Sequence, residues 1–517
     1  MIGCGMGGLA AAIALATRGC RVTLVERAAK VGGKMREVEV AGRPIDSGPT
    51  VLTMRWVFEE LFREAGAELA GRVGLVPLAV LARHAWGQDE RLDLFHDRDA
   101  SADAIGAFAG SAEARGYLSF CEDARRIFTA VERPVMLSGK PDMMAVAIRA
   151  GFDIDRVKAF TTMWRALSRH FRDQRLVQLF GRYATYCGSS PYLAPGTLML
   201  VAHVEQEGVW AVEGGMYRLA EAMAALAAER GVLIRTATSA RRILRRDGRV
   251  SGVVVVPASA EADRSTAVEE AIAADALVVN ADSAAVAAGL FGEAVASAVA
   301  PLAEEQRSLS AVASSIVARA EGFPLARHTV FFSRDYAAEF ADIFERRRLP
   351  ASPTVYVCAE DRTEPGPIDA AEAGGGAERF LVLVNAPANG DGHVYSEGEL
   401  TECHRGTFEQ MRRCGLTLVP APDHMATTDP SGFHRLFPAT GGALYGRANH
   451  SWAASMERPT PRTRIPGLYL AGGSIHPGPG IPMATLSGRL AADAIEWDLL
   501  STRRSVRGAT FGGMSTG

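Results

Sequence analysis

The opening of the chain combines one helical and one extended hydrophobic pattern. Residues 8–19 (GLAAAIALATRG) are rich in alanine and leucine, which favour a helix, and this pattern stops at Gly19. Residues 20–26 (CRVTLVE) form a largely apolar, β-branched run that ends in Glu26. The pattern therefore predicts a helix followed by a buried strand, which is the second part of a βαβ unit.

The turn before this helix carries the first candidate chemistry. Gly3, Gly5 and Gly8 have the G-x-G-x-x-G spacing that lets a pyrophosphate sit against a helix N-terminus. Such a unit needs a strand of about five residues before the turn, and only Met1 and Ile2 precede Gly3. Either the fold tolerates a truncated first strand or the natural protein begins upstream of Met1, and we expect the second.

Three further features fit a bound dinucleotide. Glu26 ends the predicted strand, where an acidic side chain accepts hydrogen bonds from both hydroxyls of an adenosine ribose. Gly32 and Gly33 allow a second close approach of the backbone to a ligand. The sequence IDSGPT at residues 45–50 adds a further loop after an exposed strand at residues 36–40. The alternatives are a surface glutamate and an ordinary hairpin.

The rest of the chain alternates between helical and extended patterns. Residues 55–205 are helical in pattern, with breaks at three prolines, and residues 206–231 predict a strand, a Gly-Gly turn and a helix. Two strands then follow around an Asp247-Gly248 hairpin turn. Residues 275–282 (DALVVNAD) predict a buried strand that returns to the first sheet.

The C-terminal part contains a second glycine loop. Residues 467–497 predict a strand, a Gly/Pro loop and a helix from Met483, whose positive N-terminus would point at a ligand shared with the first loop. Two loops on one ligand imply a long dinucleotide. We expect FAD rather than a nicotinamide cofactor, because a nicotinamide enzyme needs only one such loop, with its substrate domain beside it. A reductase that binds both cofactors needs a second G-x-G-x-x-G, and no second match is found.

Size and composition limit the remaining possibilities. A chain of 517 residues is expected to form two or three domains. A net charge of -3 gives no footprint for nucleic acid. Seven cysteines without a C-x-x-C pair indicate reduced thiols in the cytosol and no metal site. No run approaches the roughly 18 apolar residues of a membrane span, so any membrane contact is expected to be peripheral.

Several longer motifs resemble a known family. GCGMGGLAAAIALATRG, VTLVE and VGGK are similar to the start of the glutathione-reductase-like flavoproteins, which include amine oxidases and carotenoid desaturases. DSGPTVLTM, GVWAVEGGMYRLA and LYLAGGSIHPGPGIPMATLSG narrow the resemblance to the bacterial phytoene desaturase type. VLTMRWVFEELFREAG, LARHAW and GRYATYCGSSP look most like the desaturases of hydroxyneurosporene and methoxyneurosporene. The similarity runs along nearly the whole chain.

The resemblance implies an architecture. We expect an α/β protein with a Rossmann-like FAD-binding domain, an α+β substrate domain and a helical subdomain. The FAD-binding domain would be discontinuous, over residues 1–70, 206–290 and 455–500. Residues 71–205 would be a largely helical region facing substrate and membrane, residues 291–454 the substrate-binding domain, and residues 501–517 a flexible tail.

The resemblance and the glycine loops also imply partners and a cofactor site. The carotenoid substrate would come from a membrane, and the protein would be cytoplasmic and peripheral to the inner, photosynthetic membrane. The electron acceptor stays open between oxygen, a quinone and another carrier. The residues expected to bind FAD are Gly3, Gly5, Met6, Gly7, Gly8, Glu26, Arg27, Gly33, Lys34, Gly48, Pro49, Thr50, Thr238, Gly473, Ser474, Ile481, Pro482 and Met483.

The implied reaction makes the C3–C4 double bond of an acyclic 1-hydroxy or 1-methoxy carotenoid. The flavin N5 takes a hydride, the polyene spreads the positive charge and a proton leaves, so the protein mainly orients the substrate and excludes water. Candidate proton acceptors are His84, Tyr186, Glu213 and His476. The alternative roles are a loop-shaping hydrogen bond to backbone for His476, a structural turn for Glu213 and core packing for Tyr186. Phytoene desaturation, another carotenoid desaturation or isomerisation, and a non-catalytic isoprenoid carrier are the competing functions.

One segment suggests how a carotenoid enters. Residues 328–350 mix Phe331, Phe332, Phe340 and Phe344 with charged residues. We interpret this segment either as a membrane-facing tunnel mouth or as an internal strand followed by a surface helix.

Overall fold

The first sheet joins four distant parts of the chain. The computed structural model describes residues 1–260, 268–363 and 376–511. Strands β1 (Thr23–Val25) and β8 (Leu233–Arg235) pair in parallel, as do β12 (Leu277–Val279) and β18 (Leu468–Leu470). Ile2 forms parallel bridges to both Val25 and Val279, so residues 1–3 occupy the central strand position. This parallel sheet confirms the predicted Rossmann-like unit.

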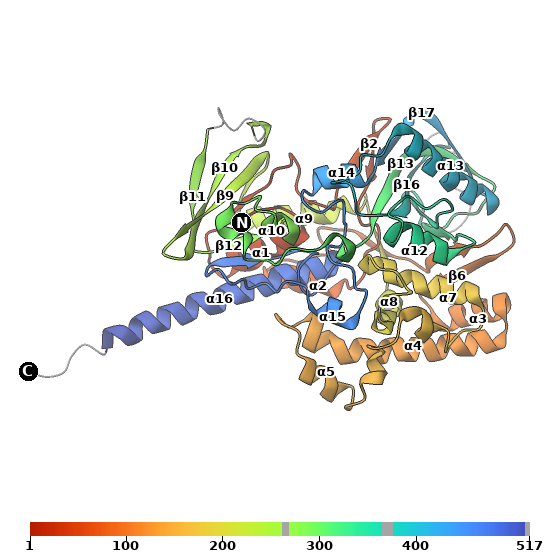
Figure 1. Cartoon of the computed structure of the whole chain (residues 1–517), viewed down its shortest axis with the longest axis horizontal. Coiled ribbons are helices and arrows are strands. Elements are labelled where there is room, and N and C mark those ends of the chain that lie inside the picture. The colour runs from red at the N-terminus through yellow and green to blue at the C-terminus, as the bar shows by residue number, and fades with distance from the viewer. Residues whose placement is uncertain (261–267, 364–375, 512–517) are drawn as a thin grey trace, which may run out of the picture.

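Helix α1 (Met6–Thr17) follows the glycine loop and is buried on nearly every side. It packs against α2 (Trp56–Glu64), α9 (Tyr217–Glu229) and α16 (Ile481–Phe511), as Figure 1 shows near the centre of the molecule. The predicted helix is therefore confirmed. Its apolar run has no polar face because helices surround it.

A small antiparallel sheet extends the FAD-type domain. Strands β9 (Thr238–Arg246), β10 (Arg249–Pro257) and β11 (Glu270–Ala273) lie in the order β11-β10-β9. Asp247 and Gly248, at the turn between β9 and β10, have φ of 51° and 78°. Two consecutive positive φ angles are the requirement of a type I′ turn, and the predicted hairpin is confirmed.

The second sheet has seven strands in the order β17-β13-β16-β15-β14-β5-β6. Their bounds are Val80–Ala85 (β5), Arg91–Phe95 (β6), Ser310–Glu321 (β13), His328–Phe331 (β14), Val355–Ala359 (β15), Glu378–Ala386 (β16) and Thr417–Thr428 (β17). Strands β5 and β6 belong to residues 71–205, which we expected to be largely helical, yet they extend the sheet of residues 291–454. The parallel pairing of β5 with β14 makes this connection.

Two further sheets of two short strands each lie outside the sheets described above. Strands β2 (Glu37–Val40) and β3 (Arg43–Asp46) form the expected hairpin, and Val40 and Ile45 pack against Val317 of the second sheet. Strand β4 (Leu75–Pro77) pairs with β7 (Trp210–Val212).

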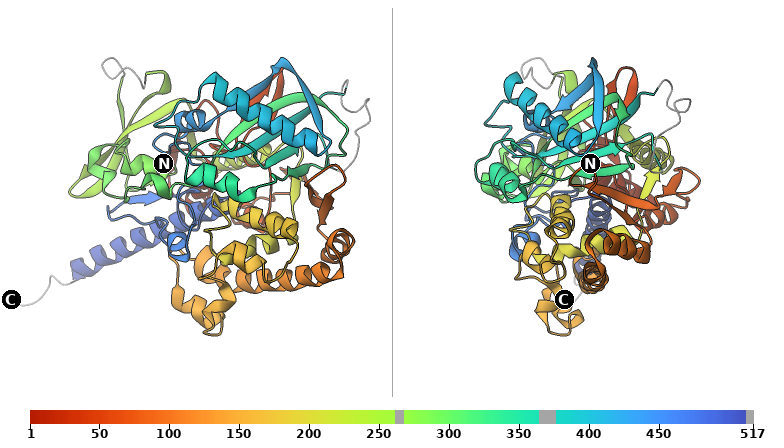
Figure 2. Two further views of the ribbon diagram at one scale, coloured as in Figure 1. Left: turned by 45° about the vertical axis from the view of Figure 1, so that its right-hand side comes forward. Right: turned by 90° about the vertical axis from the view of Figure 1, so that its right-hand side faces the viewer.

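The helical subdomain lies on the side of the second sheet opposite α13 (Figure 2). It contains α3 (Arg98–Ala109), α4 (Ser111–Val131), the π-helical turn Glu132–Met136, α5 (Met143–Arg149), α6 (Met163–Leu167), α7 (Gln174–Gly181) and α8 (Leu200–Gln206). The remaining α-helices are α10 (Ser283–Ala287), α11 (Glu293–Ala296), α12 (Tyr336–Phe344), α13 (Glu397–Arg413), α14 (Pro430–Leu436) and α15 (Trp452–Met456).

The segment 328–350 does not face outward as a tunnel mouth. Phe331 and Phe332 have no solvent exposure, and Phe340 on α12 is 3% exposed. Strand β14 lies inside the second sheet, which buries its side chains. The membrane-facing interpretation is therefore wrong, and the segment is an internal strand followed by a packed helix.

The C-terminal part differs from the expected tail. Helix α16 continues through residue 501 to Phe511, and residues 512–517 lie outside the described part of the chain. Among the helices of the described residues, none is both long and apolar enough to cross a bilayer.

Helices α1 and α16 cross at two glycines, which gives a stability prediction. A Cβ added to Gly488 would lie 2.1 Å from the backbone oxygen of Gly7. We expect Gly488→Ala to force the helices apart and to destabilise the protein by about 1–3 kcal/mol. Thermal unfolding measures this effect. Gly106→Ala in α3 is the control, because its Cβ would meet only Ala114 Cβ at 3.5 Å. An equal loss in both variants would contradict the role of the crossing.

Candidate functional site

A cavity of about 1180 Å³ runs between the parallel sheet, the second sheet and the helical subdomain. Both glycine loops line it. Of the residues expected to bind FAD, those found in its wall are Gly3, Gly5, Met6, Gly7, Glu26, Arg27, Gly33, Lys34, Gly48, Pro49, Thr50, Thr238, Gly473, Ser474, Ile481, Pro482 and Met483. Gly8 is absent from this wall. A Cβ there would lie 2.1 Å from Gly3 O, so Gly8 lets the helix pack on its own loop.

The first glycine loop is a cradle that side chains would fill. A Cβ on Gly5 would lie 2.8 Å from Asn280 Nδ2, and one on Gly7 would lie 2.6 Å from Asn280 Oδ1. Gly5 is the N-cap of α1 and supplies no side-chain cap. The first backbone N–H groups of α1 are therefore available to an anion at the positive end of the helix.

Glu26 is held in place beside this loop. Its Oε2 accepts a hydrogen bond from Cys4 N at 2.7 Å, and its Oε1 accepts one from Ala28 N at 2.8 Å. An ionised carboxylate has about four lone-pair sites, so each oxygen can accept one more hydrogen bond. Because Glu26 also lines the cavity, a pair of ribose hydroxyls fits this arrangement.

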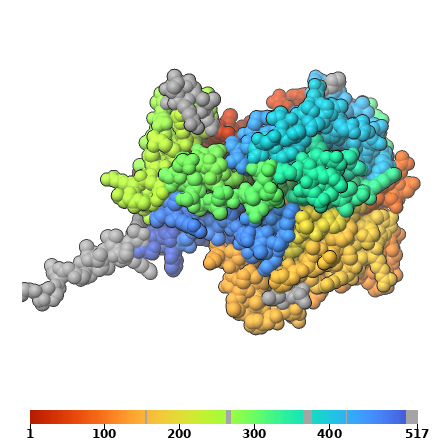
Figure 3. Space-filling model, in the orientation of Figure 1, coloured from red at the N-terminus to blue at the C-terminus, as the bar shows by residue number. Residues whose placement is uncertain are grey.

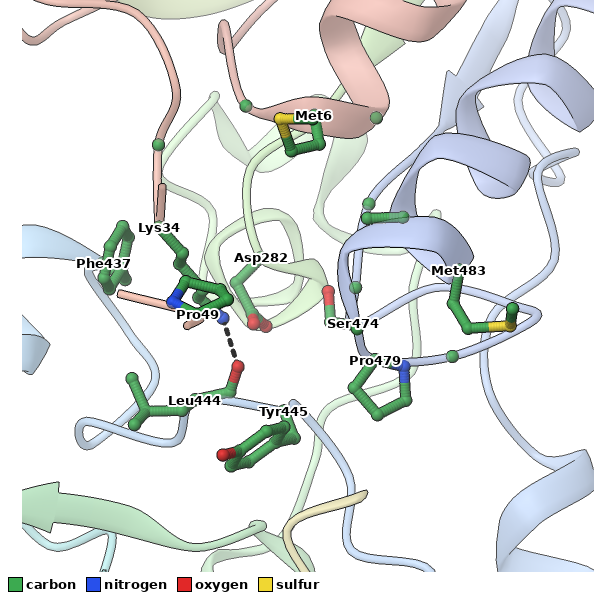
Figure 4. Close-up of a pocket in the computed structure, with 18 of the residues that line it drawn as sticks. Met6, Lys34, Pro49, Asp282, Phe437, Leu444, Tyr445, Ser474, Pro479 and Met483 are labelled. Carbon is green, nitrogen blue, oxygen red and sulfur yellow. Dashed lines mark hydrogen bonds between the residues drawn. The ribbon is translucent and has the colours of Figure 1, made fainter. Parts of the chain in front are cut away.

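Lys34 and Asp282 mark the other end of the cofactor region, where Figure 4 shows them with Pro49, Leu444 and other residues around one space. Lys34 Nζ donates to the backbone oxygen of Leu444 at 2.5 Å. Burial lowers the pKa of Lys34, and the charge of Asp282 opposes this shift. Asp282 Oδ2 is buried and has no hydrogen-bond partner among the described residues. A buried acceptor without a partner is costly, so this end favours a ligand that donates a hydrogen bond.

These features together fit a long dinucleotide. The cradle and the α1 N-terminus suit a diphosphate, Glu26 suits the ribose, and the N-terminus of α16 lies farther along the same wall at Ile481. Asp282 provides an unpartnered acceptor beyond them. The residues therefore fit FAD, which spans such a distance.

Only one of the four candidate proton acceptors lines the cavity. Tyr186 does so, and its hydroxyl donates to Glu205 Oε1 at 2.7 Å. Burial is the main cause that raises the pKa of Tyr186 above its ordinary value, which keeps the hydroxyl protonated.

The other three candidates lie outside the cavity wall. His476 is buried, and its Nε2 lies 2.9 Å from Ser138 O, which agrees with a loop-shaping role. His84 is buried within the protein, and desolvation together with Arg182 lowers its pKa to about 3. Glu213 is exposed beside Gly74. None of these three is positioned to accept a proton from a molecule in the cavity.

Several residues of the wall were missed from the sequence. Asn280 and Asp282 directly follow β12, and the end of a buried parallel strand is a recognisable position for ligand contacts. Arg458 is buried and donates to the backbone oxygens of Tyr445 and Arg447, which holds the loop over the cavity. No local pattern marks Arg458 or Tyr336, because only distant packing brings them here.

Comparisons with known proteins agree with this site. Residues 6–496 match the family described as flavin containing amine oxidoreductase. The chain is 50% identical to a hydroxyneurosporene desaturase of Rubrivivax gelatinosus, over 100% of this chain and 96% of that protein. It is 44% identical to a hydroxyneurosporene desaturase of Cereibacter sphaeroides, over 98% of each chain.

A solved structure shares the fold. An oxidoreductase from Methanosarcina mazei superimposes with a TM-score of 0.57 at 15% identity, over 94% of this chain and 97% of that chain. The family match begins at Met6, within the first glycine loop, and covers Glu26, the residues around Lys34 and the second glycine loop, which line the part of the cavity that fits FAD. The chain belongs to the flavin-containing amine oxidoreductase family and is an FAD-dependent oxidoreductase.

Proposed function

We propose that this protein is an FAD-dependent desaturase that introduces the C3–C4 double bond into acyclic 1-hydroxy or 1-methoxy carotenoids. The observation that carries the proposal is the extension of the cavity beyond the cofactor cradle. Its wall there is mostly apolar and comes from the helical subdomain and the second sheet, through residues such as Val131, Val135, Leu198, Val201 and Leu383. The full-length relatives named as hydroxyneurosporene desaturases support the same substrate class.

The protein's contribution to the reaction is mainly positioning. Bound FAD supplies the hydride acceptor for the allylic carbon. The apolar wall excludes water and holds an extended polyene, which spreads the positive charge that develops on the substrate. The hydroxyl of Tyr186 is protonated and donates a hydrogen bond to Glu205, so it is not a base for the substrate. Because the conjugated chain itself lowers the cost of proton loss, the wall needs no strong general base.

We also propose that the protein collects its substrate at an anionic bilayer surface. The 137–160 patch is an exposed apolar surface formed by Leu137, Met143, Met144, Ile148, Phe152 and Phe160. Phe152 and Phe160 are 74% and 78% exposed. Figure 3 shows this part of the chain, coloured orange, at the lower edge of the molecule.

Two observations favour a bilayer as the partner of this patch. Met136 lines the cavity and directly precedes the patch, so an apolar substrate would pass from one to the other without crossing water. Among the described residues 133–160, the exposed cations Arg133, Lys140, Arg149 and Arg156 outnumber the exposed acids Asp142 and Asp153, which suits anionic headgroups.

The cofactor site predicts a specific loss on mutation. Glu26→Ala removes two hydrogen bonds to the ribose, worth roughly 3 kcal/mol, so FAD should dissociate about a hundredfold more readily. The flavin absorbance per protein after gel filtration measures this loss. Glu39→Ala, on the exposed face of β2, is the control and should retain FAD. Equal flavin content in both variants would contradict the assignment of Glu26 to ribose binding.

The substrate proposal is tested with two carotenoids in liposomes. The holoenzyme should convert 1-hydroxyneurosporene to a product with a red-shifted absorption spectrum and leave phytoene nearly unchanged. The reason is that the polyene of 1-hydroxyneurosporene ends next to C4 and spreads the developing charge, whereas phytoene has only a short conjugated triene at the middle of its chain. Equal or faster conversion of phytoene would instead support phytoene desaturation.

The bilayer proposal is tested by co-sedimentation with vesicles of phosphatidylglycerol and phosphatidylcholine. The double substitution of Met144 and Phe152 by serine should weaken binding by roughly tenfold or more, because it removes two large apolar side chains from the membrane contact. Substitution of the exposed residues Val394 and Val419 by serine is the matched control. Unchanged binding of the first variant would show that another surface meets the bilayer.

A further inference from the structure

The guanidinium of Arg182 lies in the otherwise mostly apolar part of the cavity, whose wall also includes Glu205. Arg182 lines the cavity at the start of the helical turn that follows α7. Its guanidinium carbon lies 5.3 Å from the centre of the Tyr186 ring and 5.2 Å from that of Tyr356. The two aromatic rings stabilise the cation by cation–π contacts, which use its charge but do not satisfy its N–H donors.

The described part of the chain provides no hydrogen-bond acceptor for most of the donors of Arg182. Within the described residues, its side-chain hydrogen bond runs from Nη1 to Tyr186 Oη at 3.4 Å, and tyrosines rather than carboxylates are its main electrostatic partners. A guanidinium has five N–H donors. A buried cation without an ion pair is costly, so its retention in an apolar cavity points to a ligand acceptor.

Glu205, which also lines the cavity, is engaged by two tyrosines and forms no ion pair with Arg182. Glu205 accepts hydrogen bonds from Tyr183 at 2.6 Å and from Tyr186 at 2.7 Å. The hydroxyl of Tyr356 is likewise engaged, with Thr50 at 2.6 Å and His328 at 2.8 Å. These contacts fix the aromatic rings around Arg182 and leave the guanidinium free to meet a ligand.

A second donor without a partner lies near Arg182. Tyr336 lines the same cavity and is 5% exposed, and its hydroxyl has no hydrogen-bond partner among the described residues. Burial raises the pKa of Tyr336 well above its ordinary value, and the neighbouring charge of Glu339 acts in the same direction, whereas Arg182 opposes them. The hydroxyl therefore stays protonated and able to donate.

Glu339 does not take this donor. Its carboxylate lies behind the cavity wall, where it accepts hydrogen bonds from Thr354 N at 3.0 Å and from Asn385 Nδ2 at 3.3 Å. Tyr336 itself packs among aromatic rings, with the Phe340 ring centre 5.0 Å away. The ring of Tyr336 is thus part of the apolar wall, and its hydroxyl is an unpaired donor among the described residues.

We propose that Arg182 and Tyr336 together bind the oxygen at C1 of the carotenoid and so determine substrate specificity. This inference rests on the proposed function. Both groups are donors, so what they recognise is an acceptor oxygen, which a tertiary alcohol and a methyl ether both provide. A hydrocarbon end would leave both donors unpaired in the cavity, and a site built in this way discriminates strongly against the analogue that lacks the oxygen.

The position of the two donors suits the bond that reacts. C1 is two carbons from C3, so the oxygen must be held close to the flavin end of the cavity. Thr50, in the predicted FAD-binding loop, contacts Tyr356, whose ring lies against Arg182. The oxygen contact would then set which carbons of the polyene lie at the flavin.

The test compares three substrates: 1-hydroxyneurosporene, its 1-methoxy ether and neurosporene, which has no oxygen at C1 and carries a C1=C2 double bond. Each is supplied in liposomes to the holoenzyme and to the variants Tyr336→Phe and Arg182→Met. The wild type should prefer both oxygenated substrates to neurosporene in kcat/KM. Each variant should reduce that preference by roughly tenfold or more. The Kd of each carotenoid, measured by quenching of tryptophan fluorescence, should show that the variants also bind the oxygenated substrates with less preference over neurosporene.

Tyr192→Phe is the matched control, because the Tyr192 ring lies 6.5 Å from that of Tyr336 but is not part of the cavity wall. It should keep the wild-type preference, and all variants should keep their flavin. If the wild type converts no oxygenated substrate, the proposed function fails. If the wild type prefers oxygenated substrates and both variants retain that preference, the function stands and the assignment of Arg182 and Tyr336 is overturned. If the variants lose their preference for the hydroxy substrate but keep it for the methoxy substrate, recognition of an acceptor oxygen is contradicted.

Discussion

The close approach of the first glycine loop to the end of strand β12 is the constraint on which the rest of the structure depends. Gly5 and Gly7 leave no room for a Cβ against Asn280, and Gly7 also meets Gly488 of α16. Glycine allows this approach because it has no side chain. The contact joins the two ends of the chain, brings the N-termini of α1 and α16 to one cavity and leaves their backbone N–H groups for a ligand.

Buried charges hold the opposite side of the cavity together. Lys34 and Arg458 both donate to backbone oxygens of the loop that carries Leu444 and Tyr445. Burying a charge is costly unless hydrogen bonds compensate for the lost water. The loop therefore stabilises the two buried cations, and the cations fix the position of the loop. Arg182 differs from them, since aromatic rings rather than carbonyl groups surround it. Lys34 and Arg458 therefore have a structural role, whereas the donors of Arg182 are available for the proposed contact with substrate.

Much of the cofactor site was predictable from the sequence, whereas the substrate region was not. Each glycine loop lies between a strand position and a helix, and Glu26 ends the strand that follows α1, so this local order predicts that these residues line one cavity, as they do. His84, Glu213 and His476 have suitable chemistry, but packing places them outside the cavity wall. The same holds for Phe331 and Phe332, whose position inside a sheet depends on the strands beside them.

The sequence by itself determined the Rossmann-like unit, its helix and strands, the hairpin at Asp247-Gly248 and the residues of the glycine loops. These features depend on periodicity and on backbone conformations that neighbouring residues specify. Only the tertiary structure decided that β5 joins β14 and that Arg182, Tyr336 and Tyr356 meet in one cavity. The reason is that such contacts join residues far apart along the chain, and their formation depends on how whole sheets and helices pack rather than on any local pattern.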